Sequence, residues 1–219
     1  MKEFLLDLLF PKSCLGCRKE GTYLCQDCFA LIEISDRVFT ESKEITAVFF
    51  AADYENLLVK KLIRNFKYQP FAKDLAKILA SVIIIYFQNL EKQPSFLEDK
   101  NDFILVPIPT HKKRLRWRGF NQAEEIAKIL SARWKIPLVN DALIKTRKTL
   151  PQLNLPQEIR KKNVQGVFLC PTPELVKEKK IILVDDVFTT GATMEEAARA
   201  LKKGNPKEIY GIVVAKANP

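Results

Sequence analysis

Residues 181–193 constrain the fold of this chain more than any other part of it. They read Ile-Ile-Leu-Val-Asp-Asp-Val-Phe-Thr-Thr-Gly-Ala-Thr. The first four are consecutive apolar β-formers, which is typical of a strand buried on both faces. Asp185 and Asp186 follow where we expect that strand to end, and a turn over 189–193 then leads into an apolar-periodic helix. The run therefore predicts strand, acid pair, turn and helix in immediate succession.

The turn predicts an anion site. A helix start offers unpaired backbone N–H groups and the positive end of the helix dipole, and small hydroxylated residues let an anion approach. Asp185 and Asp186 would repel a phosphate unless they bind something else, such as sugar hydroxyls or a metal ion. A sugar phosphate suits this arrangement. The alternative is an ordinary buried strand followed by an N-capped helix, since Thr caps helices well.

The rest of the chain alternates between strand and helix patterns, which predicts an α/β fold. We expect strands at 45–52, 103–108, 180–184 and 208–215, and helices at 54–67, 75–90, 121–134 and after 193. This rhythm is typical of a mainly parallel sheet flanked by helices on both faces. Ligands of such sheets bind outside the carboxyl ends of the strands, where Asp185 and Asp186 are expected.

Two CxxC pairs near the N-terminus predict a small metal-binding module. Cys14 and Cys17 form one pair, and Cys25 and Cys28 form the other. Four thiolates close a tetrahedral structural zinc site, while disulfides and a redox CxxC are the competing interpretations. We expect a zinc-ribbon-like module over 1–35, with a short leading amphipathic helix, and a second domain over 36–219. Cys170 is expected to be a small apolar filler.

Length and charge limit the function classes. The chain has 219 residues, 28% of them charged, and a net charge of +10. We expect no membrane span and no export signal, and therefore a cytoplasmic protein. Basic residues cluster at 111–118, 160–162 and 177–180. Such clusters attract nucleic acid or pyrophosphate; the alternative is a lysine-rich solvated surface, and charge alone does not choose between them.

Two polar segments are candidates for contacts with a ligand. The first, 109–122, is expected to be a loop in which Arg116 and Arg118 offer planar forks for phosphate oxygens. Trp117 and Phe120 either anchor this loop or stack on a base. The second, 145–168, is expected to be either a mobile lid or a surface excursion. His111, the only histidine, is given no catalytic role.

The motif at 181–193 resembles the ribose-phosphate signature of type I phosphoribosyltransferases. Together with the blocks Leu-Leu-Phe-Pro before the CxxC pairs, Phe66-Lys67-Tyr68, Val106-Pro107-Ile108-Pro109 and Arg118-Gly119-Phe120-Asn121-Gln122, it makes the chain similar to the ComF family. The pattern of Arg160, Asn163, Gly166 and Phe168 also fits, but Lys161 and Lys162 stand where the family commonly has arginine.

The resemblance implies binding of phosphoribosyl pyrophosphate with Mg²⁺. Asp185 and Asp186 would then contact the ribose hydroxyls. The 5′-phosphate would be held by Thr189, Thr190, Gly191, Ala192 and Thr193. Pyrophosphate or nucleic acid would be contacted by Arg114, Arg116, Arg118, Asn121, Gln122, Arg147, Arg160 and Lys161.

The resemblance also implies a cytoplasmic role in DNA uptake and natural transformation. The protein would handle incoming single-stranded DNA at the inner face of the membrane, alongside a DNA helicase or translocase. We expect a phosphoribosyltransferase whose acceptor the sequence does not identify. The alternatives are a catalytically silent nucleic-acid-binding adaptor that retains the fold, and a nucleobase-salvage phosphoribosyltransferase.

Overall fold

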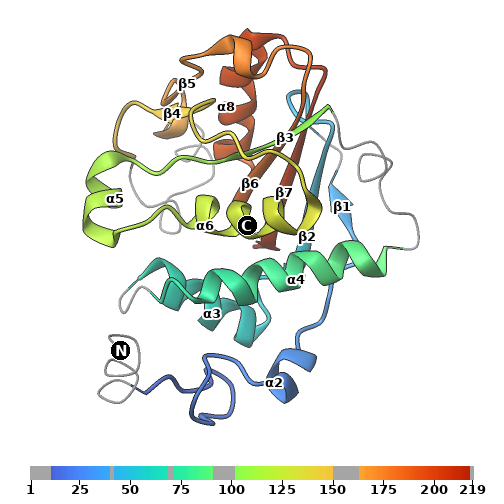
Figure 1. Cartoon of the computed structure of the whole chain (residues 1–219), viewed down its shortest axis with the longest axis vertical. Coiled ribbons are helices and arrows are strands. Elements are labelled where there is room, and N and C mark those ends of the chain that lie inside the picture. The colour runs from blue at the N-terminus through green and yellow to red at the C-terminus, as the bar shows by residue number, and fades with distance from the viewer. Residues whose placement is uncertain (1–10, 40–41, 69–71, 91–101, 150–162, 218–219) are drawn as a thin grey trace.

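The central feature of the fold is a five-stranded, mainly parallel sheet (Figure 1). The computed structural model describes residues 11–39, 42–68, 72–90, 102–149 and 163–217. The order across the sheet is β1-β2-β7-β6-β3, and β2, β7, β6 and β3 are parallel to one another. The strands are β1 (Val38–Phe39), β2 (Ala47–Asp53), β3 (Phe103–Pro107), β6 (Lys180–Phe188) and β7 (Glu208–Lys216). The predicted fold class is confirmed.

Helices cover both faces of this sheet, as predicted. The helices α3 (Leu57–Lys67), α4 (Leu75–Asn89) and α6 (Gln122–Trp134) share one apolar cluster with the sheet. Helix α8 (Ala192–Leu201) belongs to the cluster on the other face, together with the short ribbon of β4 (Ile144–Lys145) and β5 (Phe168–Leu169). The remaining short elements are α2 (Gln26–Ala30), α5 (Lys112–Arg118), η3 (Pro173–Leu175) and η4 (Lys202–Gly204).

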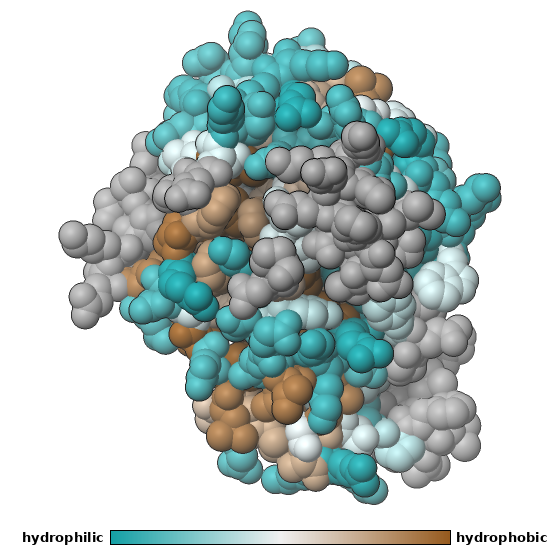
Figure 2. Space-filling model, turned by 180° about the vertical axis from the view of Figure 1, so that it is seen from behind, coloured by the Kyte–Doolittle hydropathy of each residue, from teal (hydrophilic) through white to brown (hydrophobic). Residues whose placement is uncertain are grey.

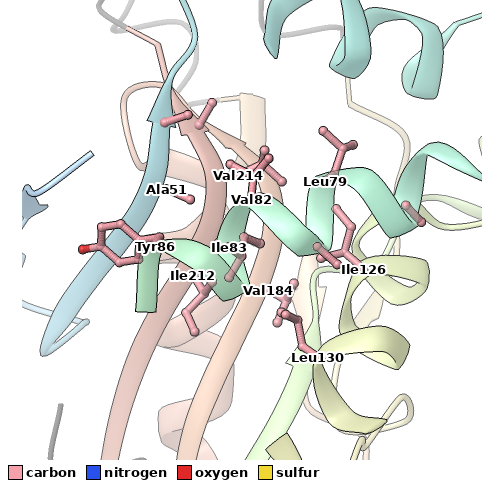
Figure 3. Close-up of a cluster of buried hydrophobic side chains, with 14 of the residues drawn as sticks. Ala51, Leu79, Val82, Ile83, Tyr86, Ile126, Leu130, Val184, Ile212 and Val214 are labelled. Carbon is pink, nitrogen blue, oxygen red and sulfur yellow. The ribbon is translucent and has the colours of Figure 1, made fainter. Parts of the chain in front are cut away.

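The alternation of side chains along β6 creates the two apolar clusters. Ile182 and Val184 belong to the cluster with α4 and α6, whereas Ile181 and Leu183 belong to the cluster with α8. Figure 3 shows the first cluster, in which side chains of α4 and α6 pack against the central strands. A strand that is apolar on both faces is what a parallel sheet between two helical layers requires. The run at 181–184 therefore places β6 in the middle of the domain.

Strand β6 is longer than predicted, because its neighbour β7 pairs with it over a longer stretch than its other neighbour β3 does. Its pairing with β3 ends where Val184 meets Pro107. Its pairing with β7 continues until Phe188 meets Lys216. Asp185 and Asp186 thus lie inside β6 and beyond the end of β3, rather than after the strand as we expected.

The prediction of a loop over 109–122 is wrong for its central part. Residues 112–118 form the helix α5, whose N-cap is His111. Its Nδ1 accepts a hydrogen bond from the N–H of Lys113 at 3.2 Å. The helix ends at Gly119, which has a φ of 86° that favours glycine. The basic residues were mistaken for loop residues because this helix has no buried face that would create an apolar period.

The cysteine-rich segment packs on α3 and α4. Lys61 of α3 donates to the carbonyl of Leu15 at 3.3 Å, and Lys12 forms an ion pair of 2.9 Å with Asp74. Buried cysteines of this segment belong to the same apolar cluster as α3 and α4. The division of the chain at residue 35 stays a prediction. The expected leading helix lies outside the described residues, as does the middle of the segment 145–168.

The surface is hydrophilic at one end of the molecule and partly apolar at the other. Figure 2 shows apolar residues gathered at the lower end, where Figure 1 places α2 and α3. Leu31, which follows α2, and Leu57 of α3 are 68% and 74% exposed. Among the described residues, no helix has both the length and the hydropathy that a membrane span requires.

The packing of α8 on the sheet yields a testable prediction. A Cβ at Gly211 of β7 would press on the sulfur of Met194 in α8 and lie 3.1 Å from Val48 Cγ2. Gly211→Ala should therefore lower the free energy of unfolding by about 1–3 kcal/mol, measured by urea denaturation. Met194→Ala makes room for the new methyl group, so the two changes should be less than additive. Full additivity would contradict the proposed contact.

Candidate functional site

A cavity of about 390 Å³ opens at the carboxyl ends of β3 and β6. In a parallel sheet this edge is where ligands bind. Its walls come from the ends of β2, β3 and β6 and from α3, α5, α6, α8 and β4. The lining residues are Tyr54, Lys67, Tyr68, Ile108, Pro109, Thr110, Arg114, Trp117, Arg118, Asn121, Gln122, Ala123, Lys145, Thr149, Asp185, Asp186, Val187, Thr189 and Thr193.

The two aspartates point to opposite faces of β6, because successive side chains of a strand alternate. Asp186 lies on the face of α3, where its Oδ1 forms an ion pair of 2.8 Å with Lys67 Nζ. Only 5% of Asp186 is exposed. Burial by itself would lower the pKa of Lys67, but the charges of Asp186 and Asp185 outweigh it and raise this pKa. Lys67 therefore stays charged and neutralises Asp186.

Asp185 lies on the face of α8 and has no such close counter-ion among the described residues. Its Oδ1 accepts a hydrogen bond of 2.8 Å from the N–H of Asp186. Burial, and then the charge of Asp186, raise the pKa of Asp185 to about 7. The two acids consequently differ: Asp186 is paired with a lysine, whereas Asp185 has a raised pKa. Their adjacency in sequence did not suggest this difference.

The turn between β6 and α8 is shaped for close approach of a ligand. Gly191 is the N-cap of α8 with a φ of 79°, and a Cβ there would lie 2.8 Å from the Phe188 ring. The N-cap residue Gly191 has no side chain that could cap the first turn of α8. The hydroxyl of Thr190 is buried and has no hydrogen-bond partner among the described residues. A helix start with a glycine N-cap, beside a buried hydroxyl that lacks a hydrogen-bond partner in the described structure, is suited to an anion.

Cationic side chains form part of the cavity wall. Lys67, Arg114, Arg118 and Lys145 line it, against the two carboxyls of Asp185 and Asp186. The lining is thus net positive even with both acids ionised. The Nε of Arg118 is buried without a partner in the described structure. Burial lowers the pKa of Arg118, and it lowers the pKa of Lys145 to about 8 with a further contribution from Arg114.

The cavity brings together most of the site residues that the sequence predicted. These are Asp185, Asp186, Thr189, Thr193, Arg114, Arg118, Asn121 and Gln122. Gly191 lines a small adjoining pocket, and Ala192 is the first residue of α8. The amides of Asn121 and Gln122 also hold the structure, because they donate to the carbonyls of Ile108 at 3.1 Å and Phe66 at 3.2 Å.

Other predicted site residues lie elsewhere. Arg116 is exposed on α5 and is not part of the cavity lining. Arg147 donates to the carbonyl of Gln165 at 2.6 Å, outside the lining. Arg160 and Lys161 lie outside the described residues. Their predicted roles stay predictions.

Several lining residues were not predicted as site residues. The block Phe66-Lys67-Tyr68 was noticed only as part of a family pattern, although Lys67 pairs directly with Asp186. Lys145 and Thr149 begin the segment that was expected to be a lid. No local sequence pattern identifies these residues as site residues. They reach the cavity only because α3 and β4 cross over the strand ends.

The four N-terminal cysteines form a cluster that could hold a metal ion. All four sulfur atoms lie within 4.8 Å of one another. Cys14 Sγ is 3.8 Å from Cys25 Sγ, and Cys17 Sγ is 3.6 Å from the same atom. These separations are too long for disulfides, and they fit the roughly 3.8 Å between sulfurs that share one tetrahedral zinc at about 2.3 Å. A Cβ at Gly16 would lie 2.6 Å from Cys28 Sγ, so only glycine fits there.

Comparison with known proteins agrees with the fold. Residues 115–219 match the phosphoribosyl transferase domain. The chain is 29% identical over 158 residues to competence protein F of Haemophilus influenzae, a match that covers 71% of this chain and 67% of the relative. It is 28% identical over 171 residues to competence protein ComFC of Bacillus subtilis, covering 74% and 61%. DNA utilization protein YhgH of Escherichia coli is 34% identical over 151 residues, covering 68% and 63%.

The parallel sheet, the β6–α8 turn and the matched domain define a phosphoribosyltransferase-like protein. Within that class, the chain is similar to competence protein F, ComFC and YhgH, the relatives of the ComF type. The matched segments span about two thirds or less of the length of these three relatives.

The raised pKa of Asp185 predicts a pH dependence of stability. Between about pH 5 and 7 the folded state holds a proton on Asp185 that the unfolded state has already released, so the free energy of unfolding falls as pH rises. Asp185→Asn removes this effect. The stability of the wild type relative to this variant should fall by about 2–3 kcal/mol across that range. Urea denaturation at each pH measures it, and Asp141→Asn at an exposed position is the control. A difference that does not change with pH would contradict the assignment.

Proposed function

We propose that the protein binds phosphoribosyl pyrophosphate, together with Mg²⁺, in the cavity at the end of β6. The observation that supports this most is the adjacency of three features. They are a helix start with a glycine N-cap beside the buried hydroxyl of Thr190, an acid pair at Asp185 and Asp186, and an excess of cationic side chains. A 5′-phosphate, a ribose and a pyrophosphate require these three features in turn.

The acid pair can recognise the ribose. Lys67 engages one oxygen of Asp186, and a backbone N–H engages one oxygen of Asp185. Each carboxylate has a second oxygen with further lone pairs, which can accept a hydrogen bond from a ribose hydroxyl. Binding of this kind fixes the sugar so that its C1 faces the cationic wall.

The cationic wall can stabilise the leaving group. Breaking the bond between C1 and pyrophosphate develops positive charge on the sugar and negative charge on the leaving oxygen. Arg114 and Arg118 offer donors to that oxygen and its neighbours. Mg²⁺, when bound with the pyrophosphate, neutralises further charge. We accordingly infer a phosphoribosyltransferase, and we leave the acceptor unnamed.

We further infer a role in the uptake and use of DNA, since two relatives are named competence proteins and a third is named a DNA utilization protein. A binding surface for single-stranded DNA is the second candidate function. Lys112, Lys113 and Arg116 are exposed on α5, and Trp117 of the same helix is 58% exposed at the cavity. Basic groups beside an exposed ring suit phosphates and bases of a single strand. An adaptor without turnover would use this surface and retain the cavity only for ligand binding.

Calorimetric titration with phosphoribosyl pyrophosphate and Mg²⁺ tests the proposed ligand. The wild-type protein should bind, and the double variant Asp185→Asn, Asp186→Asn should show no measurable affinity, because both hydroxyl acceptors have lost their charge. Arg118→Gln should weaken binding by roughly 10- to 100-fold, since a charge-assisted contact in a buried site is lost. Arg116→Gln is the matched control on the same helix, and it should change affinity by less than about twofold.

Two outcomes would contradict this proposal. One is unchanged affinity in the double aspartate variant, which would show that the acids do not touch the ligand. The other is an equal effect of Arg116→Gln and Arg118→Gln, which would indicate a diffuse charge effect rather than a cavity contact. If affinity for a single-stranded oligonucleotide falls with Arg116→Gln but survives the double aspartate variant, the DNA surface is separate from the cavity.

We also propose that the cysteine cluster holds one structural zinc ion. Elemental analysis of the purified protein should give about one zinc per chain. Gly16→Ala should reduce this content, because its methyl group would displace the Cys28 sulfur. Gly211→Ala is the control, since its methyl group crowds Met194 and Val48 in the packing of α8 on the sheet and not the cysteines. Full zinc occupancy in Gly16→Ala would show that the site does not require this close approach.

A further inference from the structure

The position of Lys145 in the cavity is controlled by contacts with its neighbours. Its Nζ donates to the buried Thr149 hydroxyl at 2.9 Å and lies 5.4 Å from the centroid of the Phe168 ring. Both Lys145 and Thr149 line the cavity. The amine is therefore held in the cavity rather than free to sample solvent as a surface lysine does.

The backbone that carries Lys145 is a short two-stranded ribbon. Strand β4 pairs with β5 at Ile144–Leu169 and Lys145–Phe168. The N–H and the hydroxyl of Thr146 then both donate to the carbonyl of Val167, at 2.9 and 3.1 Å. A ribbon this short is marginal by itself and needs an anchor on the rest of the domain.

Glu196 of α8 supplies that anchor. It is 8% exposed, and its Oε1 accepts a hydrogen bond of 2.8 Å from the N–H of Gly166, which directly precedes the ribbon residue Val167. Its Oε2 forms an ion pair of 2.5 Å with Arg199. A buried carboxylate that is fully paired in this way is costly to displace, so it fixes the approach of β5 to α8.

We propose that Lys145 contacts the diphosphate group of the ligand and that Glu196 is the positioning residue that holds Lys145 in the cavity. This inference rests on the proposed function, because it names the part of phosphoribosyl pyrophosphate that Lys145 touches. The diphosphate is the more highly charged group of that ligand, and Lys145 has a second cation, Arg114, as its neighbour. Two adjacent cations suit a diphosphate better than a single phosphate.

The electrostatic setting of Lys145 supports this role. The charged or titratable groups that act on it are Arg114 of α5, Asp185 of β6 and Arg147, and His111 senses its charge in turn. Burial and Arg114 hold its pKa at about 8 in the free protein. An anion that binds beside it favours the charged ammonium form. Affinity should therefore fall as the pH rises past this value.

The arrangement also links two parts of the cavity through one helix. Helix α8 begins at the turn proposed to hold the 5′-phosphate, and Glu196 lies one turn further along the same helix. The ribbon that carries Lys145 is thus anchored on the helix that would hold the other end of the ligand. Correct spacing between the two phosphate-binding regions follows from this single rigid element.

Binding of three probes tests the inference, namely phosphoribosyl pyrophosphate, inorganic pyrophosphate and ribose 5-phosphate, each with Mg²⁺. Lys145→Met should weaken the first two by roughly 10- to 100-fold and leave ribose 5-phosphate within about twofold. Lys148→Met, at an exposed position of the same segment, is the control and should leave all three unchanged. Lys145→Arg should retain affinity for pyrophosphate at about pH 9, where the wild type loses it because its amine is then mostly neutral. Because the wild type and Lys145→Arg are compared at the same pH, the titration of Asp185 and of the ligand affects both affinities equally.

A double-mutant cycle separates positioning from general stability. Glu196→Ala should weaken binding of pyrophosphate several-fold, and the double variant with Lys145→Met should bind no more weakly than Lys145→Met alone. Glu195→Ala on the same helix is the control. If Glu196→Ala does not fold, Glu196→Gln serves in the same cycle. Additive effects would overturn the positioning role of Glu196.

The outcomes also separate this inference from the proposed function. Wild-type binding that Lys145→Met leaves intact would retain the proposed function and overturn the role of Lys145. An equal loss of ribose 5-phosphate binding would overturn the assignment to the diphosphate. Absence of binding of phosphoribosyl pyrophosphate and of pyrophosphate to the wild-type protein would overturn both.

Discussion

The continuation of β6 beyond the end of β3 is the constraint on which the candidate site depends. Because β7 supports β6 as far as Phe188 while β3 stops opposite Val184, Asp185 and Asp186 are held in rigid strand backbone at an open edge of the sheet. Strand geometry then sends the two side chains to opposite faces. One acid meets Lys67 of α3, and the other faces the side of the sheet that α8 covers.

This separation gives the two carboxyls different electrostatic roles. The ion pair with Lys67 neutralises Asp186 inside the domain, whereas burial and the neighbouring acid raise the pKa of Asp185. Further cations of the cavity wall come from α5 and β4, which are distant from each other in sequence. The cavity therefore combines opposite charges at short range, which suits a ligand that carries both hydroxyls and phosphates.

The sequence predicted the fold and many of the residues that line the cavity, but not Lys67 and Lys145. The apolar run at 181–184 and the periodic helices indicated the parallel sheet, because burial on both faces leaves an unmistakable pattern. The helix α5 was missed because an exposed basic helix has no apolar period. Lys67 and Lys145 were missed as site residues because their proximity to the aspartates arises from chain crossings, which local patterns do not encode.

The most direct test of the central claim is a crystal structure of the protein with phosphoribosyl pyrophosphate and Mg²⁺. We expect the 5′-phosphate at the N–H groups and hydroxyls of residues 189–193, and the ribose hydroxyls within hydrogen-bond distance of Asp185 and Asp186. A ligand bound elsewhere, or a ribose turned away from both carboxyls, would contradict the proposed role of this strand end.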